Sequence, residues 1–197
     1  MANGPAVLIP VKSFATAKAR LGDALDPAER ALLAQTLATA VVAAAAPYPV
    51  YVATDDPEVA EWATDLGATV VHCPNPGLNA AVRHGVALVA AAGHDRVLIA
   101  HGDLSDPAAL ADLLDLEGTV LVPDDRLDGT NVVVVSTKGR FVFSYGPGSF
   151  ARHLSEAERM GGPIHVVRDA GLALDLDDPA DLDEHRRRAR STKEQDS

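Results

Sequence analysis

Short apolar runs alternate with longer helical stretches through the first half of the chain. Residues 6–11 form a continuous apolar run, which is typical of a strand buried on both faces of a sheet. Asp26-Pro27-Ala28-Glu29 predicts a helix start, because a cap residue is followed by proline and, three residues after the cap, by glutamate. Repetition of this strand and helix unit predicts a parallel sheet with right-handed crossovers. The expected strands are Ala6–Val11, Val50–Thr54, Ala68–His72 and Arg96–Ala100, the expected helices are 26–46, 56–67, 79–92 and 107–114, and a Pro/Gly/Asn loop is expected at Cys73–Leu78.

The second half of the chain is less regular. A turn at 137–140 predicts that the expected strands Asn131–Ser136 and Phe141–Phe143 form a hairpin. From Glu184 onward the sequence is polar, and we expect a frayed tail. The pattern as a whole predicts one α/β domain, residues 1–183, with a Rossmann-like, mostly parallel sheet flanked by helices, followed by the tail at 184–197. The expected strands are Thr119–Pro123, Asn131–Ser136, Phe141–Phe143, Ile164–Arg168 and Leu172–Leu174, and the expected helices are Ser149–Met160 and one opened by Asp178-Pro179.

Composition narrows the class of protein. Hydrophobic residues make up 47% of the 197 and charged residues 23%, a globular balance that excludes wholesale disorder. The net charge of −11 argues against a binder of nucleic-acid polymers or of anionic membranes. The single cysteine, Cys73, excludes an intramolecular disulfide and a cysteine-rich zinc site. No secretory leader is recognisable and the apolar run 31–46 is shorter than the roughly 18–20 residues of a membrane span, so we expect a cytoplasmic protein.

The loop after the first predicted strand carries unbalanced positive charge. Residues 1–22 contain Lys12, Lys18 and Arg20 and no acidic residue. Neither the glycine-rich dinucleotide fingerprint nor a P-loop stands here. In an open α/β sheet, ligands bind at the carboxyl ends of the strands, and cations held there suit a polyphosphate. The loop therefore predicts a triphosphate site, with solvated surface lysines as the alternative.

Three carboxylates predict a metal site at the same edge of the sheet. Asp103 lies shortly after a predicted buried strand, and Asp175 and Asp177 alternate along an extended segment, which places them on one face. Like charges held together are unfavourable unless a cation lies between them. These oxygen ligands favour Mg²⁺ on Asp103, Asp175 and Asp177, and helix capping is the alternative role.

Two further segments suit an anionic small molecule. Residues 128–131, Asp-Gly-Thr-Asn, lead into a strand, and residues 144–149 form a glycine-rich loop that ends in Ser149 at a helix N-terminus. A helix N-terminus with a hydroxyl favours a phosphate or a carboxylate. An ordinary turn with a serine cap is the alternative for the second segment.

The ordered set of these segments, over residues 6 to about 183, resembles a known family. It is similar to the guanylyltransferases of coenzyme F-420 biosynthesis that act on 2-phospho-L-lactate or phosphoenolpyruvate. These belong to the MobA-like nucleotidyltransferases, which have a GT-A type Rossmann-like core. The chain departs from the family pattern at two positions. His101 is not a residue expected there, and relatives often carry proline at the position of Ser105. The resemblance rests on Pro10-Val11-Lys12, Lys18, Arg20-Leu21, Gly77-Leu78-Asn79-Ala80-Ala81, Gly102-Asp103-Leu104, Asp128-Gly129-Thr130, Tyr145-Gly146-Pro147-Gly148-Ser149-Phe150 and Leu174-Asp175-Leu176-Asp177.

The resemblance implies a reaction and a role for each motif. The phosphate of a three-carbon phosphoacid would attack the α-phosphorus of GTP, releasing pyrophosphate. An alanine-, arginine- and aspartate-rich composition, typical of high-GC genomes, favours phosphoenolpyruvate over 2-phospho-L-lactate. By resemblance, Lys12, Lys18 and Arg20 hold the β- and γ-phosphates, Asp103, Asp175 and Asp177 hold Mg²⁺, Gly77, Leu78 and Asn79 lie beside the guanosine, and Thr130, Gly146 and Ser149 hold the phosphoacid.

Two alternative functions remain open at this point. One is a related nucleotidyltransferase with another nucleoside triphosphate or acceptor, such as a molybdopterin or a sugar phosphate. The other is a nucleotide-binding protein without catalytic activity. The sequence leaves the oligomeric state and the residues that select guanine undetermined.

Overall fold

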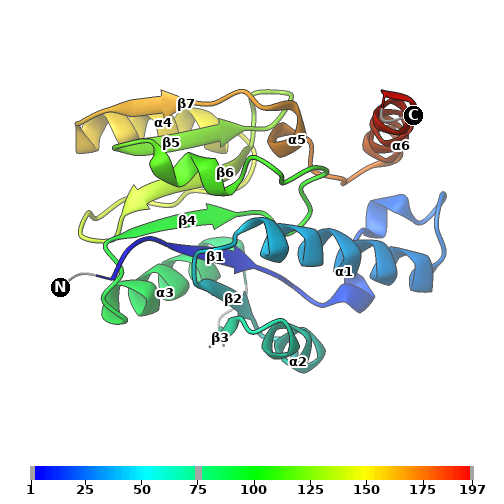
Figure 1. Cartoon of the computed structure of the whole chain (residues 1–197), viewed down its shortest axis with the longest axis horizontal. Coiled ribbons are helices and arrows are strands. Elements are labelled where there is room, and N and C mark those ends of the chain that lie inside the picture. Colours follow the sequence, from blue (N-terminus) through cyan, green and yellow to red (C-terminus); the bar gives the residue numbers. More distant parts are fainter. Residues whose placement is uncertain (1–2, 74–76, 196–197) are drawn as a thin grey trace.

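The computed structural model describes residues 3–73 and 77–195, with side chains described up to residue 187. Within this part of the chain, seven strands form one sheet in the order β3-β2-β1-β4-β6-β5-β7 (Figure 1). The strands are β1 Ala6–Pro10, β2 Val50–Thr54, β3 Thr69–His72, β4 Arg96–Ala100, β5 Thr119–Pro123, β6 Thr130–Ser136 and β7 Ile164–Val166. The helices are α1 Pro27–Ala44, α2 Pro57–Asp65, α3 Leu78–Ala91, α4 Ser149–Met160, α5 Ala170–Ala173 and α6 Pro179–Gln195, with 3-10 turns η1 Phe14–Thr16, η2 Ala19–Leu21 and η3 Ala111–Asp115.

The sheet is mostly parallel in its first half and mixed in its second. β1 pairs in parallel with both β2 and β4, whereas β6 runs antiparallel between β4 and β5. The expected Rossmann-like α/β class is confirmed. The central position of β1 explains its continuous apolar run, since residues 6–9 are fully buried between two helical layers.

Helices cover both faces of the sheet. One apolar layer joins the strands to α1, α2 and α5, and the other joins them to α3 and α4. α3 approaches β1 so closely that a Cβ added to Gly85 would lie 2.6 Å from a Leu8 methyl carbon. Helix α1 begins as expected, with the full capping box between Asp26 and Glu29.

Two expected strands are absent from the described structure, for different reasons. Phe141–Phe143 does alternate, with both phenylalanines buried and Val142 exposed. Its backbone, however, bonds side chains of α4 instead of a strand, as the Val142 N–H donates to Glu156 at 2.9 Å. Residues 172–174 belong instead to α5 and the residue after it, because Asp169 caps the backbone N–H groups of Gly171 and Leu172.

Several element boundaries also differ from expectation. The helix expected at 107–114 is the shorter 3-10 turn η3, and the strand expected at 164–168 ends at Val166. α6 continues through the segment from Glu184 that we expected to fray. Ion pairs three residues apart, such as Arg187 to Glu184 at 2.6 Å, support its helical conformation. Residues 74–76 of the expected loop at 73–78 lie outside the described residues.

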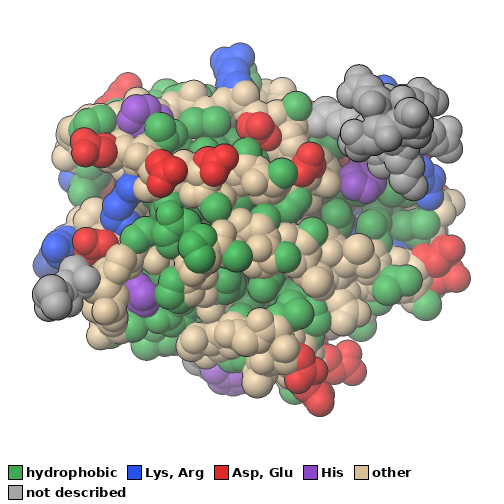
Figure 2. Space-filling view, viewed as in Figure 1, with side chains coloured by type: hydrophobic (Ala, Val, Ile, Leu, Met, Phe, Trp, Pro, Cys, Tyr) green, Lys and Arg blue, Asp and Glu red, His purple; other side chains and the backbone are tan. Residues whose placement is uncertain are grey.

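The surface reflects the net charge. On the face shown in Figure 2, Lys and Arg side chains lie apart from one another among more numerous acidic ones. Among the described residues, no helix is long and apolar enough to cross a membrane.

Substituting Gly85 with alanine should destabilise the protein, although alanine favours helices. The added methyl meets buried Leu8, so we expect a loss of about 1–3 kcal/mol in the free energy of unfolding, measured with urea. Ala87→Gly on the exposed face of the same helix is the control, with a loss of about 1 kcal/mol from helix propensity alone. A stabilised Gly85→Ala would show that α3 can move away from β1 at little cost.

Candidate active site

A pocket of about 730 Å³ opens at the carboxyl ends of β1, β2 and β4. This volume lies in the range of small-molecule sites. Several residues with expected roles line it: Lys12, Lys18, Gly77, Leu78, Asp103 and Asp177. The pocket therefore brings together most of the site residues expected in the first half of the chain, whereas Arg20 and Asn79 are not among its lining residues.

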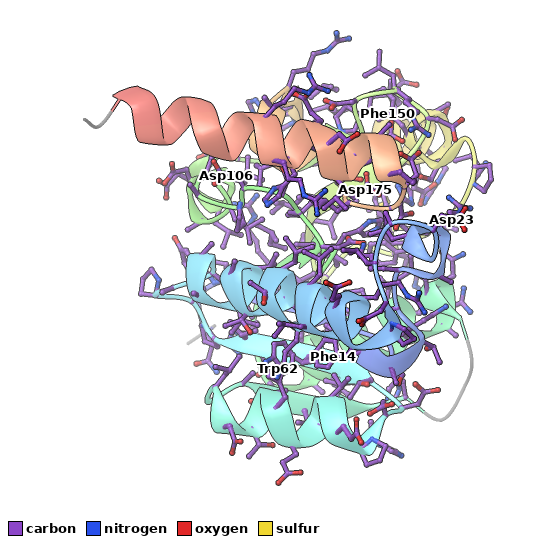
Figure 3. All side chains as sticks on the ribbon, turned by 90° about the vertical axis from the view of Figure 1, so that its right-hand side faces the viewer. Phe14, Asp23, Trp62, Asp106, Phe150 and Asp175 are labelled. Carbon is purple, nitrogen blue, oxygen red and sulfur yellow. The ribbon has the colours of Figure 1, made fainter. Side chains whose placement is uncertain are left out.

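The loop after β1 is held in place by its apolar residues. Phe14 packs edge-on against Trp62, with ring centroids 5.2 Å apart (Figure 3). Leu21 is fully buried and clusters with Leu37 of α1 and Leu176. Because Leu176 lies between Asp175 and Asp177, the same cluster brings the cationic loop next to the acidic segment.

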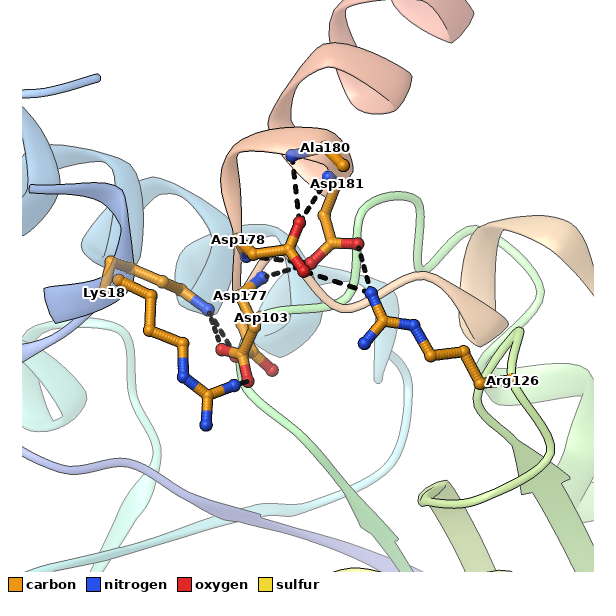
Figure 4. A network of polar contacts seen from close by, with 8 residues as sticks. Lys18, Asp103, Arg126, Asp177, Asp178, Ala180 and Asp181 are labelled. Carbon is orange, nitrogen blue, oxygen red and sulfur yellow. Dashed lines mark hydrogen bonds and ion pairs between the residues drawn. The ribbon is translucent and has the colours of Figure 1, made fainter. Parts of the chain in front are cut away.

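Lys18 stands between two of the expected metal ligands. Its ammonium contacts the Asp103 carboxylate and lies 3.4 Å from Asp177 Oδ1 (Figure 4). The Lys18 side chain is only 5% exposed, and its backbone has φ of 56°, an unusual value for a residue with a side chain. Arg20 is 77% exposed and 4.0 Å from Asp177. Lys18 is thus the principal counter-ion of these carboxylates.

A short antiparallel pairing explains how the acids meet across the sequence. Leu104 forms a bridge with Asp175, and the Ser105 N–H donates to the Leu174 carbonyl at 2.8 Å. Asp175 is thereby placed beside Asp103, although 72 residues separate them in the sequence numbering. Arg126 holds the following turn through Asp178 at 3.0 Å and Asp181 at 3.7 Å.

The protonation of these acids reflects their crowding. Burial alone would raise the pKa of Asp103, but the nearby Lys18 and His101 charges lower it below its usual value. The pKa of Asp175 is raised, by burial first and then by the negative charges of Asp103 and Asp177. Asp175 therefore lies where an additional cation would relieve repulsion.

The donor set suits a hard divalent cation. Three carboxylates offer the oxygen ligands that Mg²⁺ prefers, and the raised pKa of Asp175 marks an incompletely balanced negative charge. In the described part of the chain, no three His, Cys, Asp or Glu side chains already converge as a set of metal ligands. Lys18 lies between Asp103 and Asp177.

The residues expected to hold the phosphoacid form a second cluster. Thr130 begins β6 and Ser149 begins α4; both are buried, and their hydroxyl oxygens are 3.4 Å apart. Gly146 is exposed, with φ of 116°, in the loop before α4. Asp128 joins the two segments, since it accepts from the Gly148 N–H at 3.0 Å.

Asn79 connects the two clusters. Its amide nitrogen donates to the Tyr145 carbonyl at 3.1 Å, and its oxygen accepts from the Tyr145 N–H at 2.7 Å. The ring of Tyr145 also lies 5.6 Å from that of His101, at the pocket. The side chain of Asn79 is thus used to hold the second loop against the first helix turn of α3.

Sequence reasoning missed two residues of the second cluster. Arg152 donates to the carbonyls of Ser144 and Pro147, both at 2.8 Å, and so clamps the glycine-rich loop. His153 bonds both Thr130 and Ser144. The spacing of residues along the helix could have identified His153. It follows Ser149 by one turn, and Ala157 continues the same buried face.

Two solved structures illustrate the proteins that share this architecture. A protein from Desulfovibrio desulfuricans G20, classed with the nucleotide-diphospho-sugar transferases, aligns with a TM-score of 0.74 at 16% identity over 92% of this chain and 85% of its own. A nucleotidyl transferase from Methanothermobacter aligns with a TM-score of 0.64 at 16% identity over 93% and 98%. The fold is that of the Rossmann-like nucleotidyltransferases.

The sequence assigns the chain more narrowly. It belongs to the family described as guanylyl transferase CofC like, whose model matches residues 5–195. A phosphoenolpyruvate guanylyltransferase from Rubrobacter xylanophilus is 41% identical over 89% of this chain and 90% of its own. One from Sphaerobacter thermophilus is 37% identical over 90% of each chain. The family expected from the ordered motifs is confirmed, and with it the expectation of a nucleotidyltransferase enzyme.

His153 should make stability depend on pH. Burial first, and then the Arg152 and His101 charges, lower its pKa to about 4, while Glu156 acts in the opposite direction. The unfolded chain takes up this proton near pH 6.5 and the folded chain does not. Stability is therefore complete above pH 6.5 and lost as the pH falls towards 4.

Between pH 7.5 and 5 this amounts to about 2 kcal/mol of the free energy of unfolding. Urea titrations at both pH values, on the natural chain and on His153→Gln, isolate the contribution. The variant should lack this increment. An equal loss in both proteins would assign the pH dependence to other groups.

Proposed function

We propose that this chain transfers GMP from GTP to phosphoenolpyruvate and releases pyrophosphate, as a cytoplasmic enzyme of coenzyme F-420 biosynthesis. Family membership and the names of its curated relatives support the reaction. The main structural support for this proposal is that the Lys18 ammonium contacts both Asp103 and Asp177 in the pocket at the carboxyl end of the sheet. Cations and carboxylates meet there as a metal-dependent triphosphate reaction requires.

The cationic loop would hold the triphosphate. Lys12 is exposed on the pocket wall, and Lys18 is buried against the acids beside it. Positive charge near the β- and γ-phosphates stabilises the charge that develops on departing pyrophosphate. Arg20, at the outer edge, would act at longer range.

The carboxylates of Asp103, Asp175 and Asp177 would hold Mg²⁺, which neutralises phosphate charge in such transfers. With a phosphate present, Lys18 has an anionic partner other than Asp103. Its ammonium would then move from the carboxylates to the triphosphate. The acids would then be neutralised by Lys18 before the substrates bind and by Mg²⁺ afterwards.

The second cluster would position the acceptor. Thr130, Gly146 and Ser149 would bind the phosphoacid. This phosphate is already ionised at neutral pH, so the reaction requires no general base. Gly77 and Leu78 line the pocket and would lie beside the guanosine, while Asn79 would link this wall to the acceptor loop.

Product analysis tests the reaction. Purified protein with Mg²⁺ and GTP, given phosphoenolpyruvate, 2-phospho-L-lactate or 3-phospho-D-glycerate, should release pyrophosphate and yield the guanylylated phosphoenolpyruvate, detected by mass spectrometry. Asp103→Asn should lower the rate by about 100-fold or more, because a charge that stabilises the transition state is lost. Asp106→Asn, on an exposed neighbour, is the matched control and should leave the rate unchanged.

Other outcomes would redirect the assignment. A preference for CTP, UTP or a sugar phosphate would indicate a related nucleotidyltransferase. Binding of GTP without turnover of any phosphoacid would indicate a nucleotide-binding protein. Full activity of Asp103→Asn would overturn the metal assignment.

Lys18 should compete with the metal in the absence of nucleotide. Lys18→Met keeps the length of the side chain and removes the charge between Asp103 and Asp177. We expect Mn²⁺ to bind this variant about tenfold more tightly, a difference of about 1.4 kcal/mol, as measured by electron paramagnetic resonance. Arg20→Met, on an exposed cation, should change the affinity by less than about twofold. Unchanged or weaker Mn²⁺ binding by Lys18→Met would show that the ammonium and the ion occupy separate positions.

A further inference from the structure

His153 is a fully buried histidine that no part of the proposed reaction uses. It lies one turn into α4 and has no exposed surface. Its ring packs between two aromatic side chains, with centroid distances of 4.9 Å to Tyr145 and 5.8 Å to Phe141. Burying a polar ring in this way is unfavourable unless its nitrogens are hydrogen-bonded, and both are.

The two hydrogen bonds of the ring determine its tautomer. The Ser144 backbone N–H lies 2.9 Å from Nε2, and a backbone N–H can only donate. Nε2 must therefore be the unprotonated acceptor. In a neutral imidazole the proton is then on Nδ1, which lies 3.0 Å from Thr130 Oγ1 and donates to it.

The direction of the bond from His153 to Thr130 decides how many hydroxyl protons of Thr130 and Ser149 remain free for a ligand. Thr130 and Ser149 carry one hydroxyl proton each, and the bond between their oxygens, 3.4 Å apart, uses one of the two. Had His153 accepted from Thr130, the second proton would be used as well. Because His153 donates, one hydroxyl proton of the pair remains available, with no acceptor given by the described residues. A surplus hydroxyl proton favours an anionic ligand.

We propose that His153 is a positioning residue for the phosphoacid: by donating to Thr130 it leaves the Thr130–Ser149 pair one hydroxyl proton to donate to the bound anion. This inference rests on the proposed function, in which Thr130 and Ser149 hold the acceptor. The Ser144 backbone N–H, by occupying Nε2, thus determines that the ring donates to Thr130.

The ring also joins the two segments that form the acceptor cluster. Thr130 begins β6, whereas Ser144 begins the glycine-rich loop, and His153 bonds both at once. The neighbouring Arg152 binds the carbonyls of the same loop. Burial keeps the ring neutral at physiological pH, with a pKa of about 4, so the donor and acceptor roles stay assigned. Loss of the ring would therefore affect the orientation of hydroxyls more than the nucleotide side.

The tautomer can be measured directly on the ligand-free natural chain. Long-range ¹H–¹⁵N correlation spectra at pH 7 should show His153 protonated at Nδ1 and unprotonated at Nε2. A proton on Nε2, or an imidazolium, would overturn the inference. This measurement does not depend on which reaction the enzyme performs or on whether a variant folds.

Two variants test the two hydrogen bonds of the ring separately. His153→Asn places an amide donor near the Nδ1 position and retains the bond to Thr130. His153→Gln places an acceptor near the Nε2 position and retains only the bond to Ser144. In His153→Gln no donor holds the Thr130 oxygen, so its hydroxyl can turn away from the anion. We therefore expect this variant to raise the KM for phosphoenolpyruvate about tenfold, comparable to the loss of one hydrogen bond to a charged group, with the KM for GTP unchanged. His153→Asn should stay within about threefold of the natural chain for both substrates.

The outcomes distinguish this inference from the proposed function. If the natural chain does not use phosphoenolpyruvate, the proposed function fails, and the spectra still decide the tautomer. If it is active and His153→Gln has an unchanged acceptor KM, the positioning role fails. Equal increases in the KM values for GTP and acceptor, in both variants, would indicate a general structural role instead.

Discussion

The mutual repulsion of Asp103, Asp175 and Asp177, which lie near one edge of the sheet, is the constraint on which the rest of the site depends. Asp175 has its pKa raised by burial and by the charges of Asp103 and Asp177, so the acids need a positive charge close to them. Lys18 supplies it, buried against Asp103. The apolar cluster of Leu21, Leu37 and Leu176 holds the cationic loop and the acidic segment together while this charge is balanced.

In the proposed function, each substrate would have its own wall. The loop after β1 and the first turn of α3 would form the nucleotide wall, and the start of β6 with the loop before α4 would form the acceptor wall. Asn79 connects them by both atoms of its amide, through the backbone of Tyr145. These two hydrogen bonds connect the walls to each other, and an in-line transfer between two phosphate groups would require such fixed positions.

Local sequence signals predicted much of the fold. The capping box at Asp26 and the buried run of β1 are properties of neighbouring residues, and both were predicted correctly. Phe141–Phe143 shows the limit. Its alternation has the period of a strand, but the Val142 N–H found a glutamate of α4 as its acceptor. Alternation reports which side chains are buried, and not which group accepts the backbone hydrogen bonds.

The sequence by itself determined the family, the α/β class and the kinds of charged group that the site contains. The tertiary structure alone decided how these groups share their bonds: that Lys18 lies between Asp103 and Asp177, that Asn79 binds a backbone, and that His153 donates to Thr130. Hydrogen bonds and ion pairs depend on positions to within a fraction of an ångström. Those positions result from packing between segments far apart in the chain, which no local pattern of residues contains.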